Sequence, residues 1–175
     1  MNKPAWIIRT YRQNDSARLR SFNCASAGTK WQVEVEQFVR NQLHDWAIAP
    51  VAKAKQDSRV ILLICRSSRD LVGVAAHELA SLASSDGTTF VGTKIEVVAV
   101  SSNWQGRTFS SGERASDVLM SAVMHDIATR RRPPRSNLVF AVVHKDNTRS
   151  IAMCQRHGFD REMTSPNSNY RRLLT

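Results

Sequence analysis

A strand, a helix and a second strand follow one another between residues 94 and 144, and this succession constrains the fold more than any other feature. KIEVVAV (94–100) and NLVFAVVH (137–144) are apolar runs rich in β-branched residues, as is typical of strands buried in a sheet. Between them, small and apolar residues recur every three or four positions from Ala115 to Ile127, as on one side of a helix. Such a unit makes a right-handed crossover, so we expect the two strands to be parallel neighbours.

The other strand-like segments predict a mixed sheet. WIIRTY (6–11) predicts a short strand, and SRVILLICRS (58–67) with LVGVAAHELA (71–80) predicts an antiparallel hairpin. Residues 81–93 are small and polar and are interpreted as a loop, and NYRRLL (169–174) is the expected last strand.

Three further helices are expected. Asn14 and Asp15 offer an N-cap for a short helix, and TKWQ (29–32) has the spacing of a capping box before a helix over 30–46. The third helix covers 147–157 and ends at Gly158, with Phe159 packing back near Cys154. The resulting fold class is α/β, a mixed sheet with helices on both faces.

Length and composition favour one domain over 1–175, because the chain has no long linker. The longest apolar runs reach only about five residues, far below the roughly 20 of a membrane span. The first residues do not have the layout of a secretory signal, so we expect a cytoplasmic protein with no membrane partner. Cys24, Cys65 and Cys154 are too widely spaced for a disulfide framework or a zinc site, so we expect buried thiols and no metal.

The formal net charge of +10 comes from 25 Lys and Arg against 15 Asp and Glu, and it favours polyanionic partners. RRRPPR (130–135) is the densest basic cluster, but no aromatic residue interleaves with it, and arginines at a helix end also suit the helix dipole. Nucleic acid is therefore a weakly supported partner.

Two polar stretches follow the two central strands. WQGR (104–107) and GERASDVL (112–119) lie between the strand at 94–100 and the next helix. Asn147, Ser150, Cys154, Gly158 and Phe159 follow the strand at 137–144 at the spacing N-x-x-S-x-x-x-C-x-x-x-G-F. In this order of elements and in these stretches, the sequence resembles the GCN5-related N-acetyltransferase (GNAT) family. The resemblance covers roughly 58–160, and residues 5–46 fit the more variable first strand and paired helices of that family.

The resemblance implies a loop whose backbone amides bind the pyrophosphate of acetyl-coenzyme A at a helix N-terminus. The matching residues are Gln105, Gly106, Arg107, Ser111, Gly112, Arg114, Ala115 and Ser116. TFSS (108–111) makes this loop four or five residues longer than the family pattern. Either the longer loop still delivers its second half to the phosphates, or the cradle is damaged, and Glu113 has to point away from the anion.

The resemblance also implies that the two parallel strands splay apart to admit acetyl-coenzyme A. Backbone groups of Val98 and Val100 would pair with its pantetheine arm, and Asn147 and Ser150 would face that arm from the helix. A primary amine would attack the thioester directly in a ternary complex, with the Val98 N–H stabilising the oxyanion.

The resemblance leaves the general acid and the general base open. Cys154 stands at the position where the family has a tyrosine that acts as the proton donor. Cys154 is interpreted in three ways: as a proton donor to the leaving thiolate, as an acyl-accepting nucleophile, or as a small residue that fits beside the cofactor. Tyr170 could swing in from the tail instead. For the base, Glu96 comes first because it shares the alternation of Val98 and Val100. Glu78 comes second and His77 or His144 third, and each could equally be a sheet residue paired with an arginine.

The predicted function is therefore N-acetyl transfer to an amine that is a small molecule or is carried by a protein or tRNA. The longer loop and the missing tyrosine favour one alternative, a catalytically weakened coenzyme A-binding sensor or partner module. The basic surface favours the other, a nucleic-acid-binding protein. A homodimer is compatible with the resemblance.

Overall fold

The computed structural model describes residues 5–25, 29–43, 45, 57–83, 87–130, 138–163 and 168–175. Its elements, in chain order, are β1 (Trp6–Thr10), η1 (Gln13–Asp15), α1 (Ser16–Arg20), α2 (Lys30–Gln37), the π-helical turn η2 (Phe38–Gln42), β2 (Arg59–Cys65), β3 (Leu71–Ala83), β4 (Thr89–Val100), η3 (Ser102–Trp104), α5 (Ala115–Thr129), β5 (Val139–His144), α6 (Thr148–Arg156), β6 (Arg161–Glu162) and β7 (Tyr170–Leu174).

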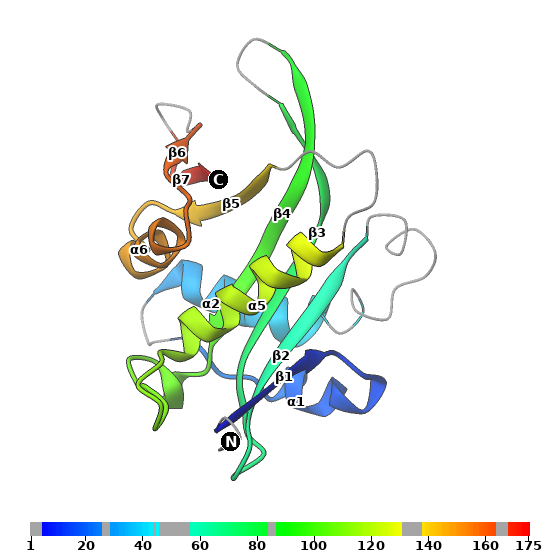
Figure 1. Cartoon of the computed structure of the whole chain (residues 1–175), viewed down its shortest axis with the longest axis vertical. Coiled ribbons are helices and arrows are strands. Elements are labelled where there is room, and N and C mark those ends of the chain that lie inside the picture. Colours follow the sequence, from blue (N-terminus) through cyan, green and yellow to red (C-terminus); the bar gives the residue numbers. More distant parts are fainter. Residues whose placement is uncertain are drawn as a thin grey trace.

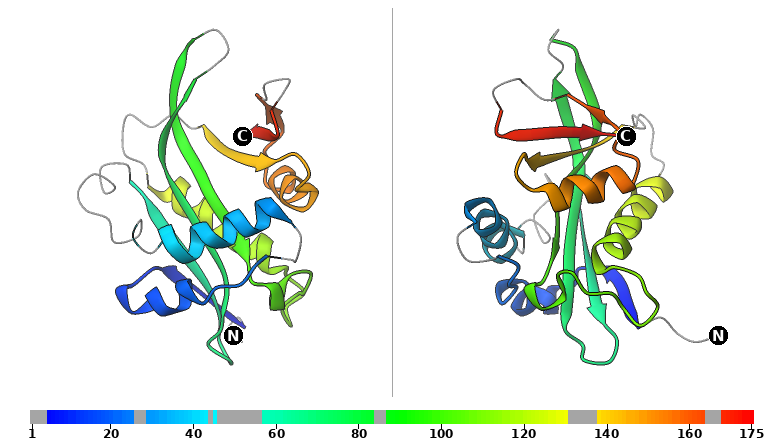
Figure 2. Two further views of the ribbon diagram at one scale, coloured as in Figure 1. Left: turned by 180° about the vertical axis from the view of Figure 1, so that it is seen from behind. Right: turned by 90° about the vertical axis from the view of Figure 1, so that its left-hand side faces the viewer.

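The strands form one seven-stranded sheet in the order β1-β2-β3-β4-β5-β7-β6. Only β4 and β5 are parallel among these pairs, and the other neighbours are antiparallel. Figure 1 shows α5 crossing in front of the central strands, and Figure 2 shows α1 and α2 on the opposite face. The predicted mixed sheet with helices on both faces is confirmed, as are the crossover from β4 to β5 and the β2–β3 hairpin.

Each face of the sheet has its own hydrophobic core. One core packs β2–β5 and β7 under α5 and α6, and Leu119, Met120 and Val123 of α5 are completely buried in it. The other core packs the opposite side of β2–β4 under α1 and the segment 30–43, where Leu19, Val39 and Leu43 are completely buried. Strands covered on both sides explain the nearly continuous apolar runs at 59–65 and 94–100.

The predicted loop over 81–93 is wrong for its described part. β3 continues to Ala83 and β4 starts at Thr89, and the two strands stay paired out to Ala83 and Thr89. Ladder hydrogen bonds join backbone groups, so small polar residues extend a hairpin whose register is already set by its apolar part.

Two further differences concern α2 and the end of the chain. Thr29 is the N-cap of α2, but its side chain makes no capping hydrogen bond, so the predicted capping box does not form. The helix predicted over 30–46 is α-helical to Gln37 and then passes into the π-helical turn, while residues 44 and 46 lie outside the described residues. The short strand β6 was not predicted, because two exposed residues carry no periodic signal. The cluster 130–135 is described only at Arg130.

Candidate functional site

The parallel strands β4 and β5 pair over only three positions. Thr93, Lys94 and Ile95 oppose Val139, Phe140 and Ala141, and the pairing then stops although both strands continue. β5 pairs on its other edge with β7 along its last five residues, so its own geometry stays regular. The strands therefore part toward their carboxyl ends, and we call the two backbone edges at 96–100 and 142–144, which do not pair with each other, the V-shaped opening.

A β-bulge sets which backbone groups of β4 face this opening. The register with β3 shifts between Ala76 and His77, which leaves one extra residue on β4 at Glu96. Before the bulge, the Thr93 N–H points to β5 and donates to the Leu138 carbonyl at 2.9 Å. After it, the Ser101 N–H points to β3 and donates to the Val72 carbonyl at 2.8 Å. Backbone direction alternates along a strand, so the N–H groups of Val98 and Val100 point toward the opening.

The bulge also corrects one sequence prediction. Ile95 and Val98 pack against the same core under α5 and α6, although they are three residues apart, while Val97 and Ala99 face the other core. Glu96 lies before the switch and therefore does not share the alternation of Val98 and Val100. Its carboxylate forms an ion pair with Lys94 at 2.8 Å, so the partner is a lysine on its own strand rather than an arginine.

Helix α6 follows β5 at the opening, and both of its ends form as predicted. The Asn147 Oδ1 accepts a hydrogen bond from the Ser150 N–H at 3.1 Å, which caps the helix and leaves the amide NH₂ available as a donor. At the other end Gly158 has φ +85°, and the Phe159 N–H donates to the Cys154 carbonyl at 3.2 Å. The Gly158 N–H donates to the Gln155 carbonyl at 3.2 Å, which completes a Schellman motif.

Cys154 lies in the core beneath α6, with only 1% of its surface exposed. Burial raises the pKa of its thiol to about 11. A thiol that holds its proton this tightly is a poor proton donor to a departing thiolate of ordinary pKa, and it is a poor nucleophile. Of the three interpretations of Cys154, this environment favours the small residue that only fills space.

The loop between β4 and α5 folds as a small hairpin that uses the extra residues. Thr108 and Arg114 form an isolated antiparallel bridge, and the Phe109 N–H donates to the Glu113 carbonyl at 2.8 Å. Gly106 and Gly112 have φ +75° and +86°, and a Cβ on either would meet no atom within 4 Å. The loop is therefore open to solvent at both glycines, and α5 begins at Ala115 immediately after it.

The side chains of this loop point in two directions. The Gln105 amide donates to the carbonyls of Val100 at 3.0 Å and Cys24 at 2.7 Å, so it fixes the start of the loop to the end of β4. The Glu113 carboxylate accepts from the Ser111 hydroxyl at 2.8 Å and from the Trp6 indole at 3.2 Å, on the side facing β1. The expectation that Glu113 points away from an anion at the start of α5 agrees with this geometry.

An ion-pair network links the start of α5 to the end of α6. The Asp117 Oδ1 lies 2.6 Å from Arg156 Nη2 and 3.6 Å from His157 Nε2. Burial by itself would raise the pKa of the Asp117 carboxyl, but these two basic residues hold that pKa below its usual value. Asp117 sits in the first turn of α5, where its charge is compatible with the helix dipole but unfavourable for a neighbouring phosphate.

The other predicted bases lie in different places. His77 on β3 is 2% exposed and its Nε2 lies 2.8 Å from Asp126 Oδ2 on α5. Desolvation lowers the pKa of His77, and Asp126 only partly offsets it. This pair is one strand away from the opening, and Glu78 on the same strand opposes Lys94. Neither residue is positioned at residues 96–100 of β4.

His144 and Tyr170, by contrast, meet at the open end of β5. Their ring centroids are 5.2 Å apart in a T-shaped contact, and Trp31 of α2 stacks on His144 at 6.0 Å. The His144 Nδ1 accepts from the Asp146 N–H at 3.3 Å, which places the proton of the neutral ring on Nε2. Sequence reasoning did not place Trp31 beside His144, because its helical spacing made it a core position of α2.

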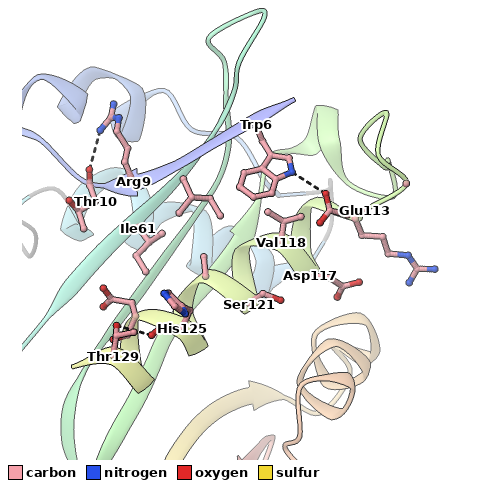
Figure 3. Close-up of a pocket in the computed structure, with 15 residues that line it drawn as sticks. Trp6, Arg9, Thr10, Ile61, Glu113, Asp117, Val118, Ser121, His125 and Thr129 are labelled. Atoms are coloured by element: carbon pink, nitrogen blue, oxygen red, sulfur yellow. Dashed lines mark hydrogen bonds between the residues drawn. The ribbon is translucent and has the colours of Figure 1, made fainter. Parts of the chain in front are cut away.

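A separate groove of about 860 Å³ lies on the other side of α5, between that helix and β1. Figure 3 shows Trp6 and Ile61 at its apolar floor, with Glu113 and Asp117 at one end and His125 and Thr129 at the other. β4 and β5 do not line it, so this groove is not the V-shaped opening.

The described residues contain no group of three or more His, Cys, Asp or Glu that could hold a metal ion. None of their helices is long and apolar enough to cross a membrane.

Comparisons with known proteins rest on structure, since no family model and no curated protein matches the sequence. A bacterial toxin superposes with a TM-score of 0.71 at 16% identity, over 98% of this chain and 90% of that one. A mutant of the toxin AtaT, solved with the C-terminus of the antitoxin AtaR and acetyl-CoA, gives 0.68 at 12% identity over 98% and 92%. A GNAT-family acetyltransferase from Streptococcus pneumoniae gives 0.52 at 12% identity over 97% and 96%. These matches run along the whole chain, and together with the parted parallel strands they show that the protein has the GNAT acetyltransferase fold.

Proposed function

We propose that the protein binds acetyl-CoA between β4 and β5 and transfers the acetyl group to a primary amine. The observation that carries this proposal is the three-residue pairing of β4 with β5, which leaves the backbone edge after the bulge free for a ligand. The acetyl-CoA-bound toxin supports it, because that protein has the same fold.

The described residues fit such a ligand. Val98 and Val100 offer N–H groups on the open edge, while the Val100 carbonyl is already taken by Gln105. The Asn147 amide adds a donor from α6. The first N–H groups of α5, including those of Ala115 and Ser116, have no partner within a helix by geometry and suit a pyrophosphate. Gly106 and Gly112 keep the loop open beside them.

Ser111 and Arg107 fit this cradle less well. Ser111 is at the tip of the small hairpin and donates to Glu113, and Arg107 lines a hollow on the face of α1. Arg114 borders the groove beside β1. Binding of the pyrophosphate would therefore depend more on the backbone N–H groups at the start of α5 than on the side chains in the second half of the loop.

The chemistry would be a direct attack. The ammonium first loses a proton to a base, the amine nitrogen then bonds to the thioester carbon and gives up a second proton, the C–S bond breaks, and the sulfur leaves as a thiolate that takes a proton. The Val98 N–H stabilises the oxyanion. Tyr170 and His144 at the open end of β5 are the best placed groups to hand over or accept a proton, and Glu96 serves as the base only when Lys94 releases it.

The amine acceptor would enter on the α2 face. Trp31, His144 and Tyr170 lie there, and Val142 is 44% exposed on the same side of β5. A homodimer stays a prediction.

Isothermal titration with acetyl-CoA tests the binding part of the proposal. We expect one saturable site per chain with a dissociation constant within the micromolar range that is common for enzyme substrates, roughly 1 µM to 1 mM. Absence of heat and of competition by coenzyme A would rule out the opening as a cofactor site. A thiol-release assay over a panel of amines then tests transfer.

A second candidate function, a coenzyme A-binding module without turnover, is favoured by the buried Cys154 in the place of the family tyrosine. Binding of acetyl-CoA with no thiol release from any amine would support it. Where thiol release is found, Tyr170→Phe tests the proton donor, because loss of turnover without loss of binding assigns Tyr170 a role in transfer.

A further inference from the structure

A polar hollow of about 780 Å³ lies at the carboxyl end of β4, on the face covered by α1. Three segments far apart in the sequence build it: the end of α1 with residues 21–23, the β2–β3 turn at 66–70, and residues 101–107 after β4. None of the proposed reaction steps uses it.

The hollow is rich in groups that donate hydrogen bonds to anions. Arg18, Arg69 and Arg107 line it together with five serines and two asparagines, against a single acid, Asp70. Arg18 is paired with Asp15 at 2.9 Å. Arg69 and Arg107 make no side-chain hydrogen bond or ion pair with any other described residue. Guanidinium and hydroxyl groups that converge in this way match the oxygens of a phosphate group.

The backbone holds one of these arginines in a costly conformation. Arg69 has φ +64°, a left-handed conformation that is unfavourable for a residue with a side chain. The turn imposes it, because the Arg69 N–H donates to the Cys65 carbonyl at 3.0 Å and the Asp70 N–H donates to the Ser68 hydroxyl at 3.3 Å. The tight turn places the Arg69 side chain at the hollow.

The hollow is separate from the proposed acetyl-CoA cradle. The cradle is formed by the start of α5, on the opposite face of the sheet (Figure 2). The Ser102 N–H donates to the Asn23 carbonyl at 2.8 Å, and Gln105 is bonded to the Cys24 carbonyl. These contacts tie the first half of the loop to the α1 side, while its second half reaches α5.

We propose that this hollow is a second anion site, which binds a phosphate group of a ligand other than acetyl-CoA. The phosphate belongs either to a small phosphorylated molecule or to the backbone of a nucleic acid, since both present the same oxygens. The site does not depend on acetyl transfer and can be tested on a protein that has no turnover.

Cys65 provides a probe at the border of the hollow, with 7% of its surface exposed. Hydrogen bonds from Ser67 and Ser68 lower the pKa of its thiol to about 7, whereas burial raises the pKa of Cys24 and Cys154 to about 11. N-ethylmaleimide at pH 7.5 will therefore alkylate Cys65 first, and peptide mass spectrometry follows its rate. We expect pyrophosphate to slow this rate about threefold or more, compared with chloride at equal ionic strength, as mass action predicts near saturation.

Matched variants show whether the protection comes from the hollow. Arg69→Gln and Arg107→Gln should each lose most of the protection, measured as the ratio of rates with and without pyrophosphate in the same variant. Arg12→Gln removes the same charge at an exposed position outside the hollow, so this variant should still show the full protection by pyrophosphate. No protection in the wild type, or equal protection in all variants, would overturn the proposal.

Three experimental arms then identify the source of the phosphate. A 5′-phosphorylated oligonucleotide that protects Cys65 at lower concentration than pyrophosphate assigns the site to nucleic acid, and the reverse order assigns it to a small phosphorylated ligand. Titration of wild type and Arg69→Gln with coenzyme A and with 3′-dephospho-coenzyme A is the third arm. If Arg69→Gln weakens only the binding of coenzyme A, the hollow is part of the cofactor site, and the proposal of a separate site is wrong.

Discussion

The two edges of β4 have opposite properties. Toward β3, eleven register pairs join the strands from Gly73 and Val100 to Ala83 and Thr89. Toward β5, three pairs join them and the remainder of the edge is unpaired by that strand. The same residues thus belong to a long, stable hairpin on one side and to an opening on the other.

The bulge at Glu96 is what allows both edges to exist on one strand. It turns the N–H groups of Val98 and Val100 away from β3, while the hairpin with β3 resumes its register one residue later. The comparison shows that the opening is not a frayed end of the sheet. It is bordered by a strand that is fully held on its far edge, so its N–H groups stay fixed in direction, and fixed direction is what an oxyanion needs.

Deletion of Glu96 should have the largest effect. Without the extra residue, Ile95 and Val97 become neighbours and still oppose His77 and Ala76, so the core side chains keep their faces and β4 loses the local bend of the bulge. A straighter β4 would close the opening toward β5, so we expect acetyl-CoA to bind at least about 100-fold more weakly by titration, a difference of about 2.8 kcal/mol.

Glu96→Gln is the control for that deletion, because it keeps the residue count and removes only the charge and its pair with Lys94. A partly exposed ion pair contributes at most about 1 kcal/mol to stability, and the bulge stays in place, so acetyl-CoA binding should change little. Equal loss of acetyl-CoA binding in the two variants would show that the carboxylate, and not the bulge, shapes the opening.

Gly73→Ala tests the closed edge. A Cβ at Gly73 would lie 2.8 Å from the Ala99 carbonyl oxygen and 3.1 Å from Leu119 Cδ2. Overpacking of this kind costs roughly 1–3 kcal/mol, and we expect that loss in thermal and urea unfolding. Ser81→Ala, at an exposed position of the same strand, should cost less than about 0.5 kcal/mol. If Gly73→Ala is as stable as Ser81→Ala, the β3–β4 edge is less tightly packed than described.

The sequence predicts the closed edge better than the open one. Apolar runs at 59–65, 71–76 and 94–100 specify buried neighbouring strands, and the Asn147 cap with Gly158 specifies both ends of α6. These features depend on local chemistry. The parting of β4 from β5 was reached only through the resemblance to a family, because no residue in KIEVVAV marks the bulge. Val97 to Val100 are all apolar, so a change of face leaves no trace in the pattern.

The candidate site shows the same limit. The N–H groups of Val98 and Val100 point toward the opening and Asn147 caps α6, while their predicted roles toward a cofactor stay predictions, and Glu96 was assigned to the wrong alternation. Arg107 was grouped with the phosphate loop, yet it lines a hollow built with α1 and the β2–β3 turn. Contacts between segments 40 to 80 residues apart depend on the packing of the loop, which local spacing does not specify.

Asn147→Ala sharpens the comparison at the open edge. It removes the cap of α6, and with it about 1 kcal/mol of stability, together with the amide that we expect to donate to the cofactor. We expect acetyl-CoA to bind about tenfold more weakly by titration, a difference of about 1.4 kcal/mol. Asn147→Ser retains a capping oxygen but not the amide, so it should keep the stability and lose the affinity. Restored affinity in Asn147→Ser would show that Asn147 acts only through the helix.

Cys154→Ala should have the smallest effect on turnover and a defined effect on the pH dependence of stability. The thiol has a pKa of about 11 in the folded protein and 9.0 as its ordinary value, so between these pH values the unfolded chain loses a proton that the folded one keeps. Stability therefore falls as the pH rises from about 9 toward 11, by about 1 kcal/mol at pH 10, and the variant should lack this part. Removing the buried sulfur atom also lowers the stability by about 1 kcal/mol. This loss is the same at every pH, so it can be distinguished from the pH-dependent contribution of the thiol. Turnover on a found amine should stay within about twofold at pH 8, because a thiol that remains protonated donates nothing to the leaving group. A tenfold fall in turnover would place Cys154 at the open edge of β4 rather than in the core beneath α6.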